Sequence, residues 1–236
     1  MQNLTSELQR LYLLPGQQVD GQAVNLVGAD GVTRALVIDF HQAPEELHWA
    51  RLCDVANALQ TELGLPAPAV SVSGGECYRL WLSLARPIPE AQAKQFLALL
   101  HKAYFEDEQI DFGRSRVDLP PALNHATGLW AAFINPSMGG ALAEDLGLEM
   151  APPEAAQAAF LERLESITEE EFAQALATLR RKHDAAPAAV QAPAMPSTAS
   201  GVEPQDLLLR DATLEDIVRH LHALGIEPTF RHVLKH

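Results

Sequence analysis

The sequence has little of several residue types, and each shortage limits what we expect of the protein. Two cysteines among 236 residues are too few for a disulfide framework, and Cys53 and Cys77 match no zinc-binding spacing. We expect two small, buried thiols in a reducing cytoplasm. No stretch approaches the roughly 20 apolar residues that span a bilayer, and the first residues lack a basic region followed by a long apolar run. Neither secretion nor membrane insertion is expected.

Basic residues are also scarce, with 17 Lys and Arg against 31 Asp and Glu, so the formal net charge is −14. A field of this sign repels phosphate backbones and anionic lipid. The charge is unevenly distributed: residues 141–172 hold nine acids and one arginine, whereas residues 79–116 hold six Lys and Arg against five acids. A nucleic-acid function therefore requires a local surface such as the second segment, or a metal ion.

What is present is an ordinary globular composition, 47% apolar and 20% charged, and 236 residues are enough for one sizeable domain or for one domain with an appendage. Residues 22–40 contain two apolar runs around Asp30-Gly31, which predicts a hairpin whose second strand, 35–38, is central and ends in Asp39-Phe40-His41. A helix is expected to open at Ala43-Pro44 and to end at Gly64.

The same order of elements then repeats. Residues 69–84 predict a second hairpin turning at Gly74-Gly75, Pro87-Ile88-Pro89 is expected to break its second strand, and residues 90–105 predict an amphipathic helix. Further strands are expected within 110–119 and 129–134. The sequence thus predicts an α+β fold with a mainly antiparallel sheet built from two ββα units.

The C-terminal part is expected to be helical. Residues 152–167 and 168–181 predict a helical hairpin, with Thr168 and Glu171 as a capping box. We predict a domain at 1–182, an Ala- and Pro-rich linker at 183–206, and a helical tail at 207–236. The tail helix, 213–224, has an apolar stripe but is too short to be stable alone, so it is expected to dock on its own domain or on another chain.

Two motifs carry candidate chemistry. Asp39 and His41 alternate on one strand, so both side chains project from the same face, a spacing that suits two metal ligands. In the second motif, Ser73-Gly74-Gly75 is followed by Arg79, so that backbone amides and a guanidinium could meet an anion. Plainer interpretations stay open. Asp39 could begin a turn beside a solvated His41, the glycines could simply make a hairpin, and Trp81 could belong to the core.

Together these motifs resemble the archaeo-eukaryotic primase superfamily, the primase–polymerases. The resemblance covers residues 22–135 and rests on Val37-Ile38-Asp39-Phe40-His41, on Ser73 to Trp81, and on Pro87-Ile88-Pro89 before a helix. It implies a primase/RRM-like core, catalytic Asp39 and Asp118, nucleotide contacts from Ser73, Gly74 and Arg79, and Mg²⁺ or Mn²⁺ held by Asp39, His41 and Asp118.

The sequence departs from the family's pattern at two of these positions. His41 stands where the second acid of an Asp-x-Asp pair is expected, and Arg79 stands where the nucleotide-contacting histidine is expected. Replacing a carboxylate by imidazole moves a site away from hard cations such as Mg²⁺. We therefore expect a catalytically degenerate relative.

Two functional hypotheses follow from the resemblance. The first is a non-catalytic module in DNA replication of a chromosome or mobile element. Such a module would bind a nucleotide or single-stranded nucleic acid through Arg79, Arg86, Arg114 and Arg116, or a protein partner or second copy through 213–224. The alternative is an active metal-dependent nucleotidyltransferase. The charge and the substituted motif favour the module.

Overall fold

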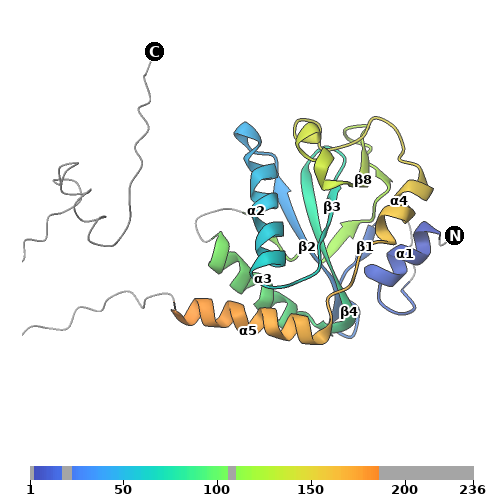
Figure 1. Ribbon diagram of the computed structural model, residues 1–236. Helices are drawn as coiled ribbons and strands as arrows, with labels where there is room; N and C mark the ends of the chain where they lie inside the picture. The colour runs from blue at the N-terminus through green and yellow to red at the C-terminus, as the bar shows by residue number, and fades with distance from the viewer. Residues whose placement is uncertain (1–2, 18–22, 106–109, 186–236) are drawn as a thin grey trace, which may run out of the picture. The chain divides into compact units, whose positions relative to one another are not determined.

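The computed structural model describes residues 3–17, 23–105 and 110–185 (Figure 1). The predicted tail helix and all of the predicted linker except 183–185 lie outside these residues. Among the described helices, none combines the length and apolar character needed to cross a membrane.

The described part is an α+β fold, as predicted, with a curled antiparallel sheet. The helices are α1 (Leu4–Leu11), α2 (Leu47–Thr61), α3 (Glu90–Tyr104), α4 (Glu154–Leu161) and α5 (Glu169–Ala185), with short 3₁₀ turns at Pro44–Glu46, Pro136–Met138 and Gly140–Leu142. The strands are β1 (Ala23–Asn25), β2 (Val32–His41), β3 (Ala69–Val72), β4 (Cys77–Pro89), β5 (Asp111–Phe112), β6 (Arg116–Asp118), β7 (Ala122–Leu123) and β8 (Trp130–Ile134). Six of them form one sheet in the order β5-β2-β4-β3-β8-β7, and β1 pairs with β6 separately.

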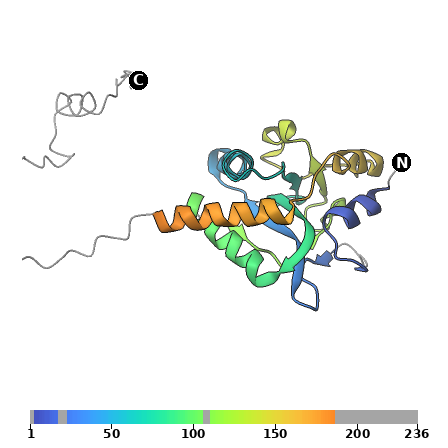
Figure 2. The ribbon, with the colours of Figure 1, turned by 60° about the horizontal axis from the view of Figure 1, so that its bottom comes forward.

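One face of the six-stranded sheet is covered by three helices. Alternate residues of β2 and β4, among them Ile38 and Leu80, point to this face and are fully buried. They pack against the apolar stripes of α2, α3 and α5, and Figure 2 shows α5 lying alongside α3. Phe96 of α3 and Phe172 of α5 join the two helices, with their ring centroids 5.1 Å apart. We call this side of the sheet the closed face.

The opposite face is covered over only part of its area. Helices α1 and α4 pack together there, and the core beneath them is built around Tyr12, Trp81 and Phe133. Figure 1 shows α1 and α4 on the side of the sheet away from α2 and α3. Beyond these two helices the same face carries polar side chains at the His41 end of β2. We call this side the open face.

The first predicted hairpin forms its turn but not its ladder. Gly28 and Gly31 close the turn by hydrogen bonds, and Val27 and Thr33 make an isolated bridge. Beyond that bridge β1 leaves β2 and pairs with β6 instead. This arrangement buries Val24 and Leu26 in the core under α1, a gain that a simple hairpin would not provide.

The prediction that Pro87-Ile88-Pro89 breaks the strand is wrong, because β4 continues through Pro89. Its neighbour β3 accompanies β4 only from Tyr78 to Trp81, and Ile88 and Pro89 pair with β2 alone. A proline therefore removes no ladder hydrogen bond from a second strand, which is why proline is tolerated at sheet edges.

The predicted helical hairpin at 152–181 is also not what the structure contains. Both helices exist, but α4 packs on α1 whereas α5 packs on α3. Between them, Ile167 exchanges hydrogen bonds with β4, its amide donating to the Ser83 carbonyl. The chain thus crosses the sheet edge between the helices. The capping box is confirmed, since Thr168 and Glu171 bond reciprocally.

The second hairpin, β3 to β4, and helix α3 are confirmed. Helix α2 begins at Leu47, later than predicted, because Glu45 and Glu46 both adopt a left-handed φ of 55°. The segment 110–119 holds two short strands in different sheets, separated at Gly113, where φ is 76°. Helix α5 continues past the predicted boundary at 182 to Ala185.

Candidate functional site

A row of polar side chains crosses four strands on the open face. In the register of the sheet, Asp111 of β5 is opposite Asp39 of β2, Asp39 is opposite Arg79 of β4, and Arg79 is opposite Ser71 of β3. Residues directly opposite one another in an antiparallel ladder project to the same face with their Cβ atoms about 5 Å apart. The sheet itself therefore brings these four side chains together.

Asp39 and Arg79 form the buried centre of this row. Asp39 is 1% exposed and Arg79 is 4% exposed, and Arg79 Nε donates a hydrogen bond of 3.2 Å to Asp39 Oδ1. A buried charge is tolerated only when it is paired, because leaving water costs several kcal/mol per ion. The predicted catalytic acid is thus already neutralised by the residue that was predicted to contact a nucleotide.

A second guanidinium reaches the other oxygen of the same carboxylate. Arg114 Nε lies 2.6 Å from Asp39 Oδ2, and Arg114 Nη2 lies 3.6 Å from Asp111 Oδ2. Within the described residues neither Asp39 Oδ2 nor Arg114 Nε makes a hydrogen bond, since the Nε–H bond is not directed at the oxygen. The contact is therefore an ion pair held by charge, and Arg114 bridges the two acids.

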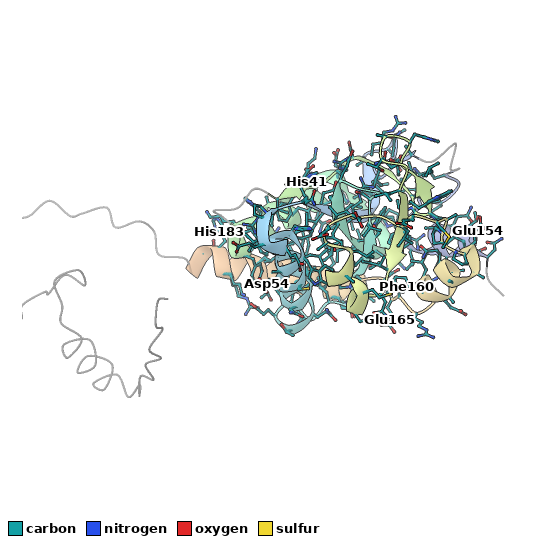
Figure 3. The ribbon with its side chains drawn as sticks, turned by 90° about the horizontal axis from the view of Figure 1, so that it is seen from above. His41, Asp54, Glu154, Phe160, Glu165 and His183 are labelled. Atoms are coloured by element: carbon teal, nitrogen blue, oxygen red, sulfur yellow. The ribbon has the colours of Figure 1, made fainter. Side chains whose placement is uncertain are left out.

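His41 completes a cluster of potential metal ligands with Asp39 and Asp111. Each residue offers one ligand atom, and the three atoms lie within 4.8 Å of one another. His41 Nε2 is 3.9 Å from Asp111 Oδ2, and both of these side chains are about half exposed. Figure 3 shows His41 at the rim of the molecule, apart from Phe160 of α4. Asp118, predicted as the third ligand, is not a member of this cluster.

Asp118 instead lines a polar cavity beside the row. The cavity has a volume of about 260 Å³, and Ser73 and Arg79 also line it. Asn124 and His125, from the turn between β7 and β8, line it as well. Three of the residues predicted for the site, Ser73, Arg79 and Asp118, are therefore brought to one cavity, and Arg79 connects it to the Asp39 cluster.

The glycine turn is engaged within the protein. The amides of Gly74 and Gly75 both donate to the Leu146 carbonyl at 2.9 Å, so an anion would have to displace that carbonyl to reach either amide. Gly74 has a φ of 87°, and a Cβ atom there would lie 2.9 Å from the Leu129 carbonyl. Glycine at position 74 is thus required by close packing. Ser73 Oγ accepts hydrogen bonds from the amides of residues 76 and 77 and closes the turn.

Cys77 lies beside the ion pairs and is fully buried, as predicted, whereas Cys53 is partly exposed. Burial, and secondly the charge of Asp39, raise the pKa of the Cys77 thiol to about 11, against the opposing effect of Arg79. A thiol with this pKa is protonated at neutral pH and is a poor nucleophile. It contributes a small apolar group to the site and no thiolate.

Trp81 belongs to the core, as the plainer interpretation held. It shares a face with Arg79, but it is 1% exposed and its Nε1 donates to Ser71 Oγ at 2.8 Å. The ring of Trp81 therefore has no exposed face on which a base could stack beside Arg79. Arg86 lies near the other end of β4, 3.5 Å from Glu169, and Arg116 is exposed on β6. Of the four predicted arginines, Arg79 and Arg114 converge on Asp39.

Asp111, Asn124 and His125 were missed by sequence reasoning. Asp111 begins a short apolar run, and only the pairing of β5 with β2 places it opposite Asp39. Asn124 and His125 follow Pro120-Pro121 in a polar turn, a pattern that signals a loop but not what the loop faces. No protein-family model matches the sequence, and no curated protein matches it significantly.

Proposed function

We propose that this domain binds a nucleotide, or the nucleotide of a single strand, in the cavity lined by Ser73, Arg79 and Asp118, and that it is a primase–polymerase relative with a degenerate catalytic centre. As a binding module it would serve DNA replication of a chromosome or mobile element. The resemblance of residues 22–135 supplies the family, and the cavity lies beside the side chains that the resemblance singles out.

The state of Asp39 is the observation that carries the proposal. The resemblance makes this residue a metal-binding acid, yet its two oxygens are occupied by Arg79 and Arg114. Two-metal nucleotidyl transfer requires carboxylates that are free to hold cations on the attacking and leaving oxygens. A carboxylate paired with two guanidiniums is better suited to holding those arginines in place than to holding metal.

The same arrangement favours anion binding. Arg79 is fixed by Asp39 in a wall of the cavity, and a guanidinium presented in a fixed orientation suits a phosphate oxyanion. His125, from the turn between β7 and β8, lines the same cavity and adds a second nitrogen group. The segment 79–116, which includes Arg79 and Arg114, holds six Lys and Arg against five acids, so it lacks the strong negative charge of the chain as a whole.

The donor set of the metal-ligating cluster defines which cation would fit it. Two carboxylates and one imidazole suit Mn²⁺ better than Mg²⁺, which prefers an all-oxygen octahedron. Asp39, His41 and Asp111 would hold such an ion, and it would supply positive charge for phosphate oxygens. Asp39 Oδ2 is buried and its contact with Arg114 is not a hydrogen bond, so it is the oxygen that such an ion would bind once Arg114 had moved away.

A second candidate is an active metal-dependent nucleotidyltransferase. The approach of three ligand atoms to within 4.8 Å favours it. It requires Arg114 to leave Asp39, and it requires Asp118 to act from the neighbouring cavity.

Binding is tested with the full chain and fluorescent nucleoside triphosphates or short single strands, in EDTA and in Mn²⁺, by fluorescence anisotropy. We expect saturable binding that Arg79→Gln weakens at least about tenfold, because a charge-assisted contact is lost. Arg86→Gln is the matched control, since it makes the same change on the same strand outside the cavity. No binding under any condition, or equal loss in both variants, would refute the nucleotide site.

Catalysis is tested by primer synthesis on a single-stranded template with Mn²⁺. We expect none from the native chain. Synthesis that disappears in Asp39→Ala, at a temperature where circular dichroism shows this variant folded, would establish the enzyme instead. Synthesis that survives Asp39→Ala would identify a contaminating polymerase.

The interaction role of 213–224 stays a prediction. Removing residues 201–236 is expected to leave the described domain folded and to abolish self-association or partner capture. Unchanged mass by light scattering and unchanged capture would contradict it.

A further inference from the structure

We infer that Arg114 is a built-in cation of the Asp39–His41–Asp111 cluster, and that a divalent metal takes its place when an anionic ligand draws the guanidinium away. The inference deepens the proposed function and rests on it for the identity of the anion. It concerns the occupancy of the cluster, which can be measured without any nucleotide.

The position of Arg114 is the first observation. Its guanidinium contacts Asp39 Oδ2 through Nε and Asp111 Oδ2 through Nη2, at 2.6 Å and 3.6 Å. Those two side chains are also two of the three potential ligands of the cluster. The arginine therefore contacts the same carboxylates that a bound cation would use, and it excludes the cation by charge as well as by volume.

The charge balance is the second observation. Asp39 and Asp111 carry two formal negative charges, and Arg79 and Arg114 carry two positive charges. A divalent cation that enters beside both arginines would add two further positive charges to a site that is already balanced. With Arg114 removed, the carboxylates and His41 regain one uncompensated negative charge and a free set of ligand atoms.

Arg114, and not Arg79, is the arginine that can leave. The Arg79 side chain is 5% exposed and makes a hydrogen bond to Asp39, whereas the Arg114 side chain is 34% exposed and its Nε makes none within the described residues. Arg114 also follows Gly113, in the connection between β5 and β6, where no ladder pairing restrains it. Turning its guanidinium toward solvent leaves the Asp39–Arg79 pair intact.

A phosphate-type oxyanion is the ligand class that would turn it. An oxyanion bound near Arg79 competes with the carboxylates for Arg114, since guanidinium binds both in the same forked geometry. Anion and metal should therefore strengthen each other's binding by the same factor, as reciprocity of coupled sites requires. The device would keep the cluster free of metal until a ligand is present.

The test titrates Mn²⁺ into the full chain and follows free Mn²⁺ by electron paramagnetic resonance. We expect the native chain to bind weakly and Arg114→Gln to bind one ion at least about tenfold more tightly, because a positive charge in contact with the ligands is gone. Arg116→Gln, with the same change of net charge two residues away, should match the native chain. Arg114→Lys should also match it, because a cation remains.

Two further arms complete the experiment. Asp111→Asn combined with Arg114→Gln should abolish the gain, which assigns it to this cluster. For the native chain, sodium sulfate should tighten Mn²⁺ binding relative to sodium chloride at equal ionic strength, after correction for the Mn²⁺ that sulfate itself binds. This measurement needs no substitution, so it tests the inference even if Arg114→Gln fails to fold.

Equal Mn²⁺ affinity in native and folded Arg114→Gln chains, or an equal gain in Arg116→Gln, would overturn the inference, as would the absence of a sulfate effect. None of these results bears on nucleotide binding in EDTA. Failure of the proposed function is visible there, where native chain and Arg79→Gln are compared without metal.

Discussion

The two faces of the six-stranded sheet are built from the same strands and differ in how completely helices cover them. On the closed face, β2 contributes apolar side chains from Leu36 to Phe40 and β4 from Tyr78 to Leu84, and three helices bury them. On the open face the same strands contribute Trp81 and Val37 under α1 and α4, and then Asp39, Arg79 and His41 where these helices stop.

The difference shows how one sheet separates stability from chemistry. The closed face buries mainly apolar side chains, and its buried Tyr78 hydroxyl and His48 ring bond to backbone carbonyls, so its stabilisation comes chiefly from burial. On the open face, Asp39, Arg79 and Arg114 can lie close together because Asp39 forms ion pairs with both arginines. Substitutions on the two faces should therefore differ in their cost and in its physical origin.

The largest effect is expected in the closed face. Phe96 is 0% exposed and contacts Phe172, with ring centroids 5.1 Å apart. Phe96→Ala should lower the free energy of unfolding by about 3–5 kcal/mol, through lost burial and a cavity. Urea unfolding followed by circular dichroism measures the change. Leu47→Ala, at a site 42% exposed, is the control and should cost far less.

On the open face the corresponding loss is electrostatic. Asp39→Asn leaves Arg79 buried without its counter-charge and should cost about 3 kcal/mol by the same measurement. The control is Glu169→Gln, which removes the ion-pair partner of Arg86, a residue of β4 like Arg79. Both side chains of that pair are mostly exposed, so the free energy of unfolding should change by no more than about 1 kcal/mol. Similar costs for the two variants would contradict the view that burial makes the Asp39 pair important.

Two neighbouring glycines test the packing at the edge of the closed face. A Cβ atom at Gly139 would lie 2.0 Å from a carbon of the Trp49 ring, whereas one at Gly140 would lie no closer than 3.7 Å. Gly139→Ala should therefore cost about 1–3 kcal/mol and Gly140→Ala close to nothing. Thermal unfolding of both variants checks this. Equal midpoints would show that the Trp49 ring moves freely.

The smallest effect concerns Cys77 of the open face and depends on pH. Its pKa is raised from 9.0 to about 11 in the folded chain, so the unfolded chain loses this proton first as the pH rises. Stability should therefore fall between pH 9 and pH 11, by about 1–2 kcal/mol from this thiol. Subtracting the fall in stability of Cys77→Ala from that of the native chain separates the effect of this thiol from those of Tyr12 and Tyr78. A difference independent of pH would contradict the assignment.

Local patterns were sufficient for most elements of the closed face. The stripe containing Phe96 and the alternation leading to Trp81 each follow from a period that a short segment displays. Pairing between distant segments was beyond reach. Nothing near Val24 indicates β6 as its partner, and the separation of α4 from α5 depends on how Ile167 meets β4.

The candidate site shows the same division. Asp39, His41 and Arg79 stood out because strand ends and a glycine turn mark them, and the structure brings Arg79 to Asp39. The role of Asp111 could not be read from its neighbours, since it depends on a two-residue strand finding the right register. The occupation of Asp39 by Arg114 depends on a side-chain conformation that no spacing rule specifies.

The row from Asp111 to Ser71 has one more consequence, which concerns the alignment of the strands. Side chains alternate between the two faces of a strand, so sliding β2 by one residue against β4 would turn Asp39 toward the leucines beneath α2 and α3. Arg79 would then lose its partner. The Asp39–Arg79 pair thus makes a misaligned sheet less stable than the correct one. A chain with an apolar pair at these two positions could be as stable, yet it would lose the feature that distinguishes the correct pairing from its nearest competitor.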